Sequence, residues 1–270
     1  LNQVDKESRL HADLIVNSNY TLDTDIETYG DITVSGGTLD LNGHTLLSHG
    51  RMDISGGTVD LNGGTLTIKG NLTQSGGTMI CNKGTLNVEG DYRIQTATTG
   101  DNGKTTYNYS DGHLYMTDEA DTINVSGNFV VQNNNSPSNT FSAGTLTIKG
   151  DFSQLKGTIG NSYDNFAASG THKVVLDGNG VQTVTFESNR SHFNALVAGP
   201  NTELHWKGHF SLNTMQYDLT VYGDVSLSNN TIDLNGHTLT MVRGEIYVRS
   251  NASSNVKITF SNSSRDDAHI

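Results

Sequence analysis

Cysteine, proline and long apolar runs are all scarce in this chain of 270 residues, which has one cysteine and two prolines. The single cysteine, Cys81, cannot form a disulfide within the chain, so no disulfide framework holds the fold. Two prolines exclude collagen-like and proline-rich structures. No run approaches 18 consecutive apolar residues, which excludes a helix that spans a membrane.

Charge is also sparse and mostly of one sign. Charged residues make up 16% of the chain, whereas about 25% is usual. There are 16 Lys and Arg against 28 Asp and Glu, which gives a net charge of −12. Phosphate backbones and anionic membranes repel such a chain, so we expect neither nucleic acid nor membrane insertion. Hydrophobic residues at 33% and 30 glycines still allow a core and argue against wholesale disorder.

A repeat of 20 residues runs through the first third of the chain. Residues 31–43 (DITVSGGTLDLNG) return as residues 51–63 (RMDISGGTVDLNG) and again in part from Asn71. Residues 64–70 (GTLTIKG) return unchanged as residues 144–150, at a distance of four periods. Near the end, residues 223–239 match residues 30–46 almost throughout. Self-similarity at a fixed period indicates a stack of repeated structural units.

Within each repeat, apolar and polar residues alternate, which is the periodicity of strands. Three short strands per repeat make one turn of an all-β, single-stranded parallel β-helix, or β-solenoid, with about 20 residues per turn. The crossover preference of parallel strands favours a right-handed coil. About 11 turns would give a rod roughly 50 Å long. Ile32, Met52, Leu72 and Tyr92 should then stack in the core.

A structural ladder of asparagines is expected at one corner of the rod. Asn42, Asn62 and Asn82 recur at the same position of three consecutive repeats. Stacking of the turns should bring their side chains together, with each amide bonding the next.

Departures from the period mark the boundaries of the solenoid. We expect an N-terminal cap or irregular first turn over residues 1–29, the solenoid over residues 30–260 and a tail over residues 261–270. Loops should leave the rod near residues 96–111, 133–142 and 160–168. Because the chain starts at Leu1 without a signal peptide, we expect a piece of a larger protein or a mature secreted form.

A more specific resemblance lies in the middle of the chain. Residues 170–178 (GTHKVVLDG), 182–186 (QTVTF) and 191–196 (SHFNAL) follow the turn at residues 144–152 (GTLTIKGDF). This order of phrases resembles the β-solenoid repeat regions of large secreted or cell-surface proteins of Gram-positive bacteria. The resemblance implies an extracellular or cell-wall-associated location and a role in adhesion, carbohydrate contact or display. It brings no catalytic motif, and His172, Gln182 and Phe193 are structural signature positions of the pattern.

Four aromatic residues are candidates for ligand binding. Tyr107, Tyr109 and Tyr115 flank the long insertion, and Trp206 lies among basic residues and histidines. Exposed aromatic rings stack on the apolar faces of sugars, while polar neighbours bond the hydroxyl groups. The alternative is that these rings pack their own segments onto the rod.

Asp118, Glu119 and Asp121 are the candidate metal ligands, because carboxylates on a loop are suited to Ca²⁺. Parallel β-helices include polysaccharide lyases, in which such a cluster holds Ca²⁺ beside a catalytic base. Basic residues are few there, and carboxylates on loops are often only solvated. Signatures of serine hydrolases, P-loop NTPases and dinucleotide-binding enzymes are missing from the sequence.

The sequence therefore predicts a non-catalytic binding or adhesion module at a bacterial cell surface. A polysaccharide or a host glycan is the expected partner, with a surface protein as the other class, and Ca²⁺ is the only cofactor considered. A purely structural stalk and a polysaccharide lyase or hydrolase stay open as alternatives. Nothing in the sequence indicates the oligomeric state.

Overall fold

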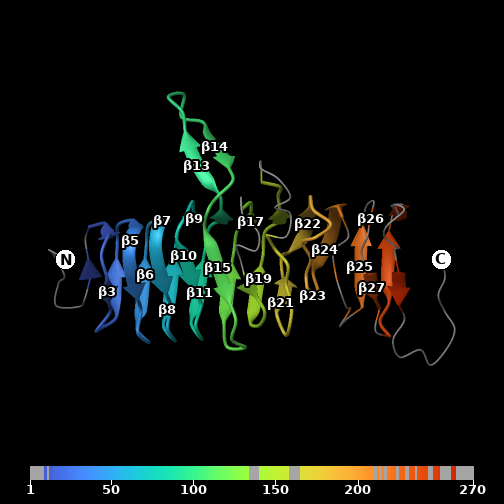
Figure 1. Ribbon diagram of the computed structural model, residues 1–270, viewed down its shortest axis with the longest axis horizontal. Coiled ribbons are helices and arrows are strands. Elements are labelled where there is room, and N and C mark those ends of the chain that lie inside the picture. Colours follow the sequence, from blue (N-terminus) through green and yellow to red (C-terminus); the bar gives the residue numbers. More distant parts are fainter. Residues whose placement is uncertain are drawn as a thin grey trace.

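A computed structural model describes residues 9–10, 12–133, 140–157, 165–209, 212, 215, 218–222, 225–228, 231–234, 236–242, 246–249 and 257–259. Every regular element in these residues is a β-strand. Parallel sheets stack into a β-solenoid of about 9 turns with roughly 22 residues per turn (Figure 1). The predicted fold class is therefore confirmed, with fewer and longer turns than the 20-residue period suggests.

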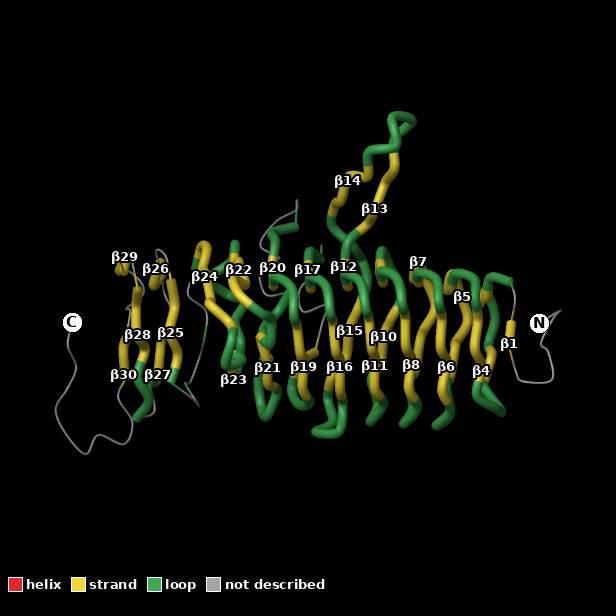
Figure 2. Tube along the Cα trace, turned by 180° about the vertical axis from the view of Figure 1, so that it is seen from behind, coloured by secondary structure: helices red, strands yellow, loops and turns green. Residues whose placement is uncertain are grey.

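The turns contribute strands to three faces, and neighbouring turns pair in parallel (Figure 2). The first face contains β2 (Leu14–Val16), the first parts of β5 (Ile32–Asp40) and β7 (Met52–Asp60), β9 (Leu72–Gln74), β12 (Tyr92–Ile94), β17 (Phe129–Val131), β20 (Phe152–Gln154), β22 (Gly180–Phe186), β24 (Thr202–Gly208), β25 (Leu219–Tyr222) and β28 (Leu239–Val242). The second face contains β3 (Tyr20–Thr21), the ends of β5 and β7, β10 (Thr78–Ile80), β15 (His113–Met116) and β18 (Thr140–Phe141). Beyond β18 the second face continues as isolated bridges among the described residues. The third face contains β1 (Arg9–Leu10), β4 (Ile26–Thr28), β6 (Thr45–Ser48), β8 (Thr65–Ile68), β11 (Thr85–Val88), β16 (Thr122–Val125), β19 (Thr145–Ile148), β21 (Lys173–Leu176) and β23 (Ala195–Ala198).

Six further strands lie outside these three faces. An antiparallel hairpin consists of β13 (Thr96–Thr99) and β14 (Thr105–Asn108). Two parallel pairs come from the C-terminal part, where β26 (Val225–Ser228) pairs with β29 (Ile246–Arg249) and β27 (Thr231–Asp233) pairs with β30 (Lys257–Thr259). The residues that the structure describes include no helix long and apolar enough to cross a membrane.

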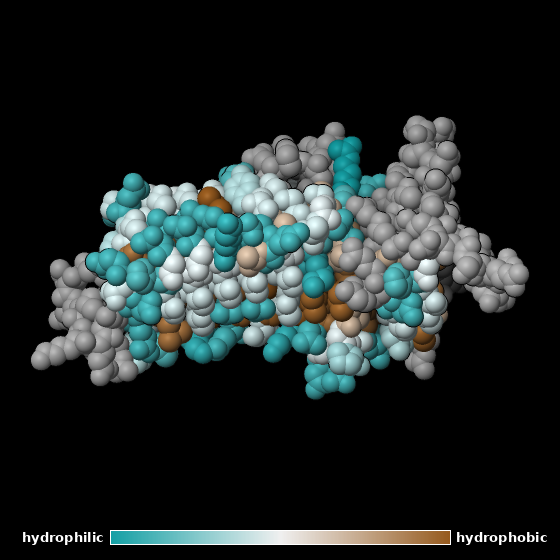
Figure 3. Space-filling model, turned by 90° about the horizontal axis from the view of Figure 1, so that it is seen from below, coloured by the Kyte–Doolittle hydropathy of each residue, from teal (hydrophilic) through white to brown (hydrophobic). Residues whose placement is uncertain are grey.

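Outward positions of the strands carry mainly polar side chains, as the alternating pattern requires. Seen from the side opposite the hairpin, the surface is mostly hydrophilic or neutral, and its hydrophobic areas are small and separate (Figure 3). That view shows no broad apolar surface over the described residues.

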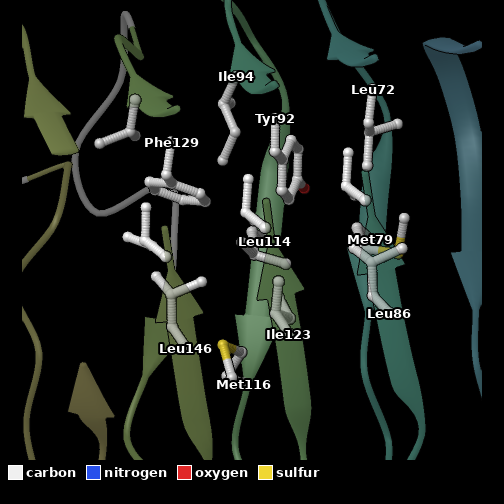
Figure 4. Close-up of a cluster of buried hydrophobic side chains, with 14 of the residues drawn as sticks. Leu72, Met79, Leu86, Tyr92, Ile94, Leu114, Met116, Ile123, Phe129 and Leu146 are labelled. Carbon is white, nitrogen blue, oxygen red and sulfur yellow. The ribbon is translucent and has the colours of Figure 1, made fainter. Parts of the chain in front are cut away.

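Inward positions form continuous stacks along the rod. Ile32, Met52, Leu72 and Tyr92 pair in register and are fully buried, which confirms the predicted core stack. Figure 4 shows Leu72 and side chains from the other two faces of the same turn, such as Met79, pointing into the interior. Each turn thus fills the centre of the rod from three directions.

The spacing of the turns changes where the hairpin leaves the rod. Thr65 pairs with Thr85, Thr85 with Thr122, and Thr122 with Thr145. The stretch from Thr65 to Thr145 therefore holds three turns and not the four that the period predicted. The hairpin accounts for most of the difference.

The other predicted boundaries are those of the N-terminal segment, of two loops and of the C-terminal tail. Within residues 1–29, strands β2, β3 and β4 pair with the following turn. The loops expected near residues 133–142 and 160–168 include residues 134–139 and 160–164, which lie outside the described residues. Residues 1–8, residue 11 and the expected tail, residues 261–270, also lie outside them.

Aspartate and asparagine side chains form a ladder of hydrogen bonds between successive turns at the corner that precedes the first face. Asp91 Oδ1 accepts a hydrogen bond from the Asn128 backbone N–H at 2.8 Å, and Asn128 Oδ1 accepts one from the Asp151 backbone N–H at 2.8 Å. The preceding glycines stack so closely that a Cβ on Gly127 would lie 2.6 Å from the Gly90 carbonyl oxygen. The recurring Gly-Asp and Gly-Asn pairs were the signal for this ladder.

The asparagines singled out from the repeat have a different role from the one expected. Asn42, Asn62 and Asn82 lie at an exposed corner with φ angles of 48°, 42° and 45°. The amide Nδ2 of Asn62 donates to Asp40 Oδ1 at 3.1 Å. Each amide bonds the preceding turn instead of the next asparagine, which corrects the predicted amide ladder. Asparagine suits this corner because it tolerates the left-handed conformation.

Replacing Asn62 with leucine is expected to lower the free energy of unfolding by about 1–3 kcal/mol, because a left-handed leucine is strained and the bond to Asp40 is lost. Asn62→Gly keeps the backbone conformation and should lose only the hydrogen bond, about 1 kcal/mol. Lys69→Ala, at an exposed position, should change stability by less than about 0.5 kcal/mol. Urea unfolding of the three variants measures the differences, and equal midpoints for Asn62→Leu and Lys69→Ala would contradict the assignment.

Candidate functional site

Among the described residues, the β13–β14 hairpin is the segment that projects from the rod (Figures 1 and 2). Its strands pair from Thr96 with Asn108 to Thr99 with Thr105. At the tip, Gly103 adopts a φ of 73°, and its N–H donates to the Gly100 carbonyl at 2.9 Å. A glycine is suited to this turn because it has no Cβ to oppose a positive φ. Apart from Thr96, which is half-buried, the residues of both strands are exposed.

Tyr107 lies on this hairpin and is held against the rod by an arginine. The Tyr107 side chain is 44% exposed. The guanidinium carbon of Arg93 lies 4.5 Å from the centre of the tyrosine ring, which is the geometry of a cation–π contact. Arg93 comes from β12, directly beneath the base of the hairpin. The contact therefore fixes the ring relative to the first face.

Arg93 is itself fixed by its neighbours. Its Nη2 and Nε atoms donate to Asp91 Oδ2 at 2.8 and 3.2 Å, and its Nη1 donates to Gln95 Oε1 at 3.2 Å. Gln95 Nε2 donates to Gln132 Oε1 at 2.7 Å. We call Asp91, Arg93, Gln95, Tyr107 and Gln132 the hairpin-base cluster.

The hairpin-base cluster combines an aromatic ring, two amides and an ion pair whose charges cancel. A ring beside amide donors and acceptors suits a ligand with both apolar faces and hydroxyl groups. Arg93 Nε and Nη2 both donate to Asp91 Oδ2, so these two donors are not open to an anionic ligand. The arrangement thus favours a neutral polar ligand over a charged one.

The other two candidate tyrosines lie apart from this ring. The backbone carbonyl of Tyr109 accepts a hydrogen bond from the Thr96 hydroxyl at 2.9 Å, and the residue is half-buried. Tyr115 lies on β15 of the second face, where its ring is stacked with His113 at 6.3 Å between centroids. The structure therefore places Tyr107 and Tyr109 at the hairpin and Tyr115 on another face.

Trp206 belongs to the core, which corrects its assignment as a ligand-binding residue. It is 2% exposed, and its ring stacks on Phe186 at 5.9 Å between centroids. Its indole N–H donates to the His209 carbonyl at 2.7 Å. The alternation along β24 turns Leu204 and Trp206 inward and His205 outward.

The acidic residues after the insertion lie in different surroundings. Asp121 is fully buried, and its carboxylate accepts hydrogen bonds from the backbone N–H groups of Lys83, Thr117 and Asp118 at 2.6, 2.7 and 3.0 Å. Asp118 Oδ1 accepts a bond from the Ala120 N–H at 3.0 Å, and Glu119 is exposed. No group of three or more His, Cys, Asp or Glu among the described residues is placed to hold a metal ion. Asp121 therefore organises a turn.

The signature positions of the bacterial pattern lie inside the rod. His172 and Phe193 are fully buried, and Gln182 is 2% exposed. The Gln182 side chain accepts from the Gly178 N–H at 2.7 Å and donates to the Ile148 carbonyl at 3.1 Å. These contacts close the turn and agree with a structural role.

Sequence reasoning missed four members of the hairpin-base cluster: Asp91, Arg93, Gln95 and Gln132. Arg93 points outward from its strand and lies only a few residues before the inserted segment. Its position in the sequence was therefore the signal that could have identified it. The pairing of Gln95 with Gln132 connects successive turns across the insertion.

A comparison of the chain with models of protein families, with curated proteins and with solved structures returns no match.

Proposed function

We propose that this chain is an extracellular, cell-surface β-solenoid that binds a polysaccharide or a host glycan without cleaving it. The observation that carries the proposal is the exposed Tyr107 ring, held by Arg93 on a hairpin that projects from the rod. A rod with one projecting, pre-ordered aromatic ring suits an adhesion module, because little freedom is lost when the ring binds.

The chemistry of the hairpin-base cluster supports a neutral sugar. The Tyr107 ring offers an apolar face, and Gln95 and Gln132 supply amides beside it. Asp91 neutralises Arg93, and the net charge of −12 repels anionic polymers. The resemblance of residues 144–196 to repeat regions of Gram-positive surface proteins supports the extracellular location.

A structural stalk is the second candidate function. It is favoured by the register of the third face, which is kept from β4 to β23 although the turns differ in length. A stalk needs only this regular stacking and no ligand.

Retention on insoluble polysaccharides and glycan-coated beads tests the proposal. The wild-type chain should be retained on at least one neutral polymer, and Tyr107→Ala should bind about fivefold more weakly, since aromatic contacts of this kind contribute about 1 kcal/mol. Thr105→Ala, on the same strand of the hairpin, is the matched control and should bind like wild type.

Retention that does not depend on Tyr107 would contradict the site. Failure of the wild-type chain to bind any polymer would favour the stalk. Release of reducing or unsaturated sugar would contradict the non-catalytic function, and a parallel series with Ca²⁺ and with a chelator tests for a metal-dependent reaction.

A further inference from the structure

A second aromatic cluster lies on the outward side of the first face, nearer the C-terminus. The rings of His205 and Tyr222 are stacked, with centroids 5.4 Å apart and planes inclined by 10°. His205 Nε2 lies 2.5 Å from Glu203 Oε1. The side chains of His205 and Glu203 are 40% and 43% exposed. We call Glu203, His205 and Tyr222 the two-ring cluster.

The parallel register explains why these side chains meet. His205 on β24 pairs directly with Tyr222 on β25, so the two rings stack across neighbouring turns. On the other side, β22 places Thr183 opposite His205 and Val181 opposite Glu203. Val181 is 60% exposed. The cluster therefore consists of a flat pair of rings with a carboxylate at one edge, and the exposed Val181 lies opposite Glu203 on the neighbouring strand.

The composition of the two-ring cluster parallels that of the hairpin-base cluster. Both present an aromatic ring that a charged or polar neighbour holds in place, and both place hydrogen-bonding groups beside the ring. The Glu203 carboxylate is an acceptor for sugar hydroxyls, and the stacked rings offer an apolar face. Neither cluster gathers the cationic groups that an anionic ligand would need.

The two clusters also share one face of the rod. Arg93 is connected to Lys207 by the register Arg93–Val130–Ser153–Thr185–Lys207. Lys207 lies two residues beyond His205 on β24, so four strand spacings, or about 19 Å, separate the clusters along the rod. Figure 2 shows β12, β17, β20, β22 and β24 in succession on the side from which the hairpin leaves.

We propose that the two-ring cluster is a second contact for the same glycan, so that the ligand is a neutral linear polysaccharide long enough to reach both clusters. This inference rests on the proposed function. Once one segment of the polymer is bound, the second contact forms at a high effective concentration. A long polymer should therefore bind much more tightly than a short fragment of it.

The test compares polymers with fragments. The probes are hydroxyethyl cellulose, xylan and mannan, each beside the trisaccharide of the same sugar. For the polymer that binds wild type, Tyr222→Ala should weaken binding by about fivefold and reduce the trisaccharide stoichiometry from two to one. Tyr222→Phe keeps the ring and should bind like wild type, and Thr220→Ala, an outward position of the same strand, should do so too.

A second group of tyrosine, histidine and glutamate on another face provides a matched control. Tyr29 stacks on His49 with centroids 4.4 Å apart, and His49 Nε2 lies 2.7 Å from Glu27 Oε1, at the third face. Tyr29→Ala should leave polymer binding unchanged, because its rings do not share the face of the hairpin. A loss of polymer affinity in this variant would overturn the assignment of the polymer to the first face.

Failure of this inference is distinguishable from failure of the proposed function. If Tyr107→Ala weakens binding while Tyr222→Ala changes neither polymer affinity nor trisaccharide stoichiometry, the second contact is wrong and the glycan-binding function stands. If wild type binds none of the polymers and none of the trisaccharides, both are wrong. A thermal melt of Tyr222→Ala that matches wild type ensures that any loss reflects the missing ring.

Discussion

Replacing Phe152 with alanine is expected to lower the free energy of unfolding by about 3–5 kcal/mol, the range for a large aromatic residue removed from a core. Phe152 is fully buried at the centre of an aromatic cluster. Its ring centroid lies 4.7 Å from that of Phe193, 5.0 Å from Phe166, 5.1 Å from Phe186 and 6.0 Å from Phe129. These rings come from several turns, so the cavity would loosen the contacts between turns as well as within one.

Urea unfolding and amide hydrogen exchange measure this effect. In a stack of repeats each turn contacts mainly its neighbours, so faster exchange in Phe152→Ala should concentrate in β17, β20 and β22. Strands β5 and β7 should be nearly unaffected. Tyr107→Ala, which removes an exposed aromatic ring, is the control and should change stability by less than about 1 kcal/mol. A Phe152→Ala variant as stable as this control would contradict the position of Phe152 in the core.

The sequence predicts the architecture of this protein well, because the 20-residue repeat and the alternation of apolar and polar residues place the same side chains in the core. Ile32 and Met52 are in register with the period and both are buried. The number of turns was overestimated, because a distance of whole periods between residues 64–70 and 144–150 conceals an inserted hairpin. A loop inserted into a solenoid adds residues without adding a turn. The loop expected near residues 96–111 therefore had to be subtracted before the turns were counted from the period.

The candidate site was predictable in part. Tyr107 was found because it lies in a polar insertion, where exposed aromatic rings are unusual. Trp206 was assigned from its polar neighbours, although the alternation along its strand places it with Leu204 in the core. Arg93 was missed because its contact with Tyr107 depends on how the hairpin lies over β12. Gln132 was missed because its bond to Gln95 connects different turns, in a register that the insertion shifts.

Acid is expected to destabilise the fold through His172. This residue is fully buried, and both ring nitrogens are without a hydrogen-bond partner. The rings of Phe141 and Phe166 lie 5.3 and 6.0 Å away. Burial among them lowers the pKa of His172 from 6.5 to about 4, because the charged imidazolium loses its hydration.

Acid lowers stability because the unfolded chain binds a proton at His172 more readily than the folded chain does. Between pH 6.5 and about 4 the unfolded chain takes up a proton at His172 and the folded chain does not. The stability that neutral His172 contributes is therefore complete above pH 6.5 and is lost as the pH falls through 4. This difference in pKa corresponds to about 3 kcal/mol.

Unfolding free energies measured from pH 7 to pH 4 test this expectation in variants of His172. His172→Phe and His172→Leu should both show a shallower loss of stability with acid than wild type, because neither can take up a proton in the unfolded state. Titration of carboxylates and of the partly buried His192 and His209 continues in every variant, so the difference between the curves isolates His172. His44→Gln, at a solvent-accessible position, is the control. If both His172 variants lost stability with acid as steeply as wild type, the imidazole would not be the neutral, buried group that the geometry indicates.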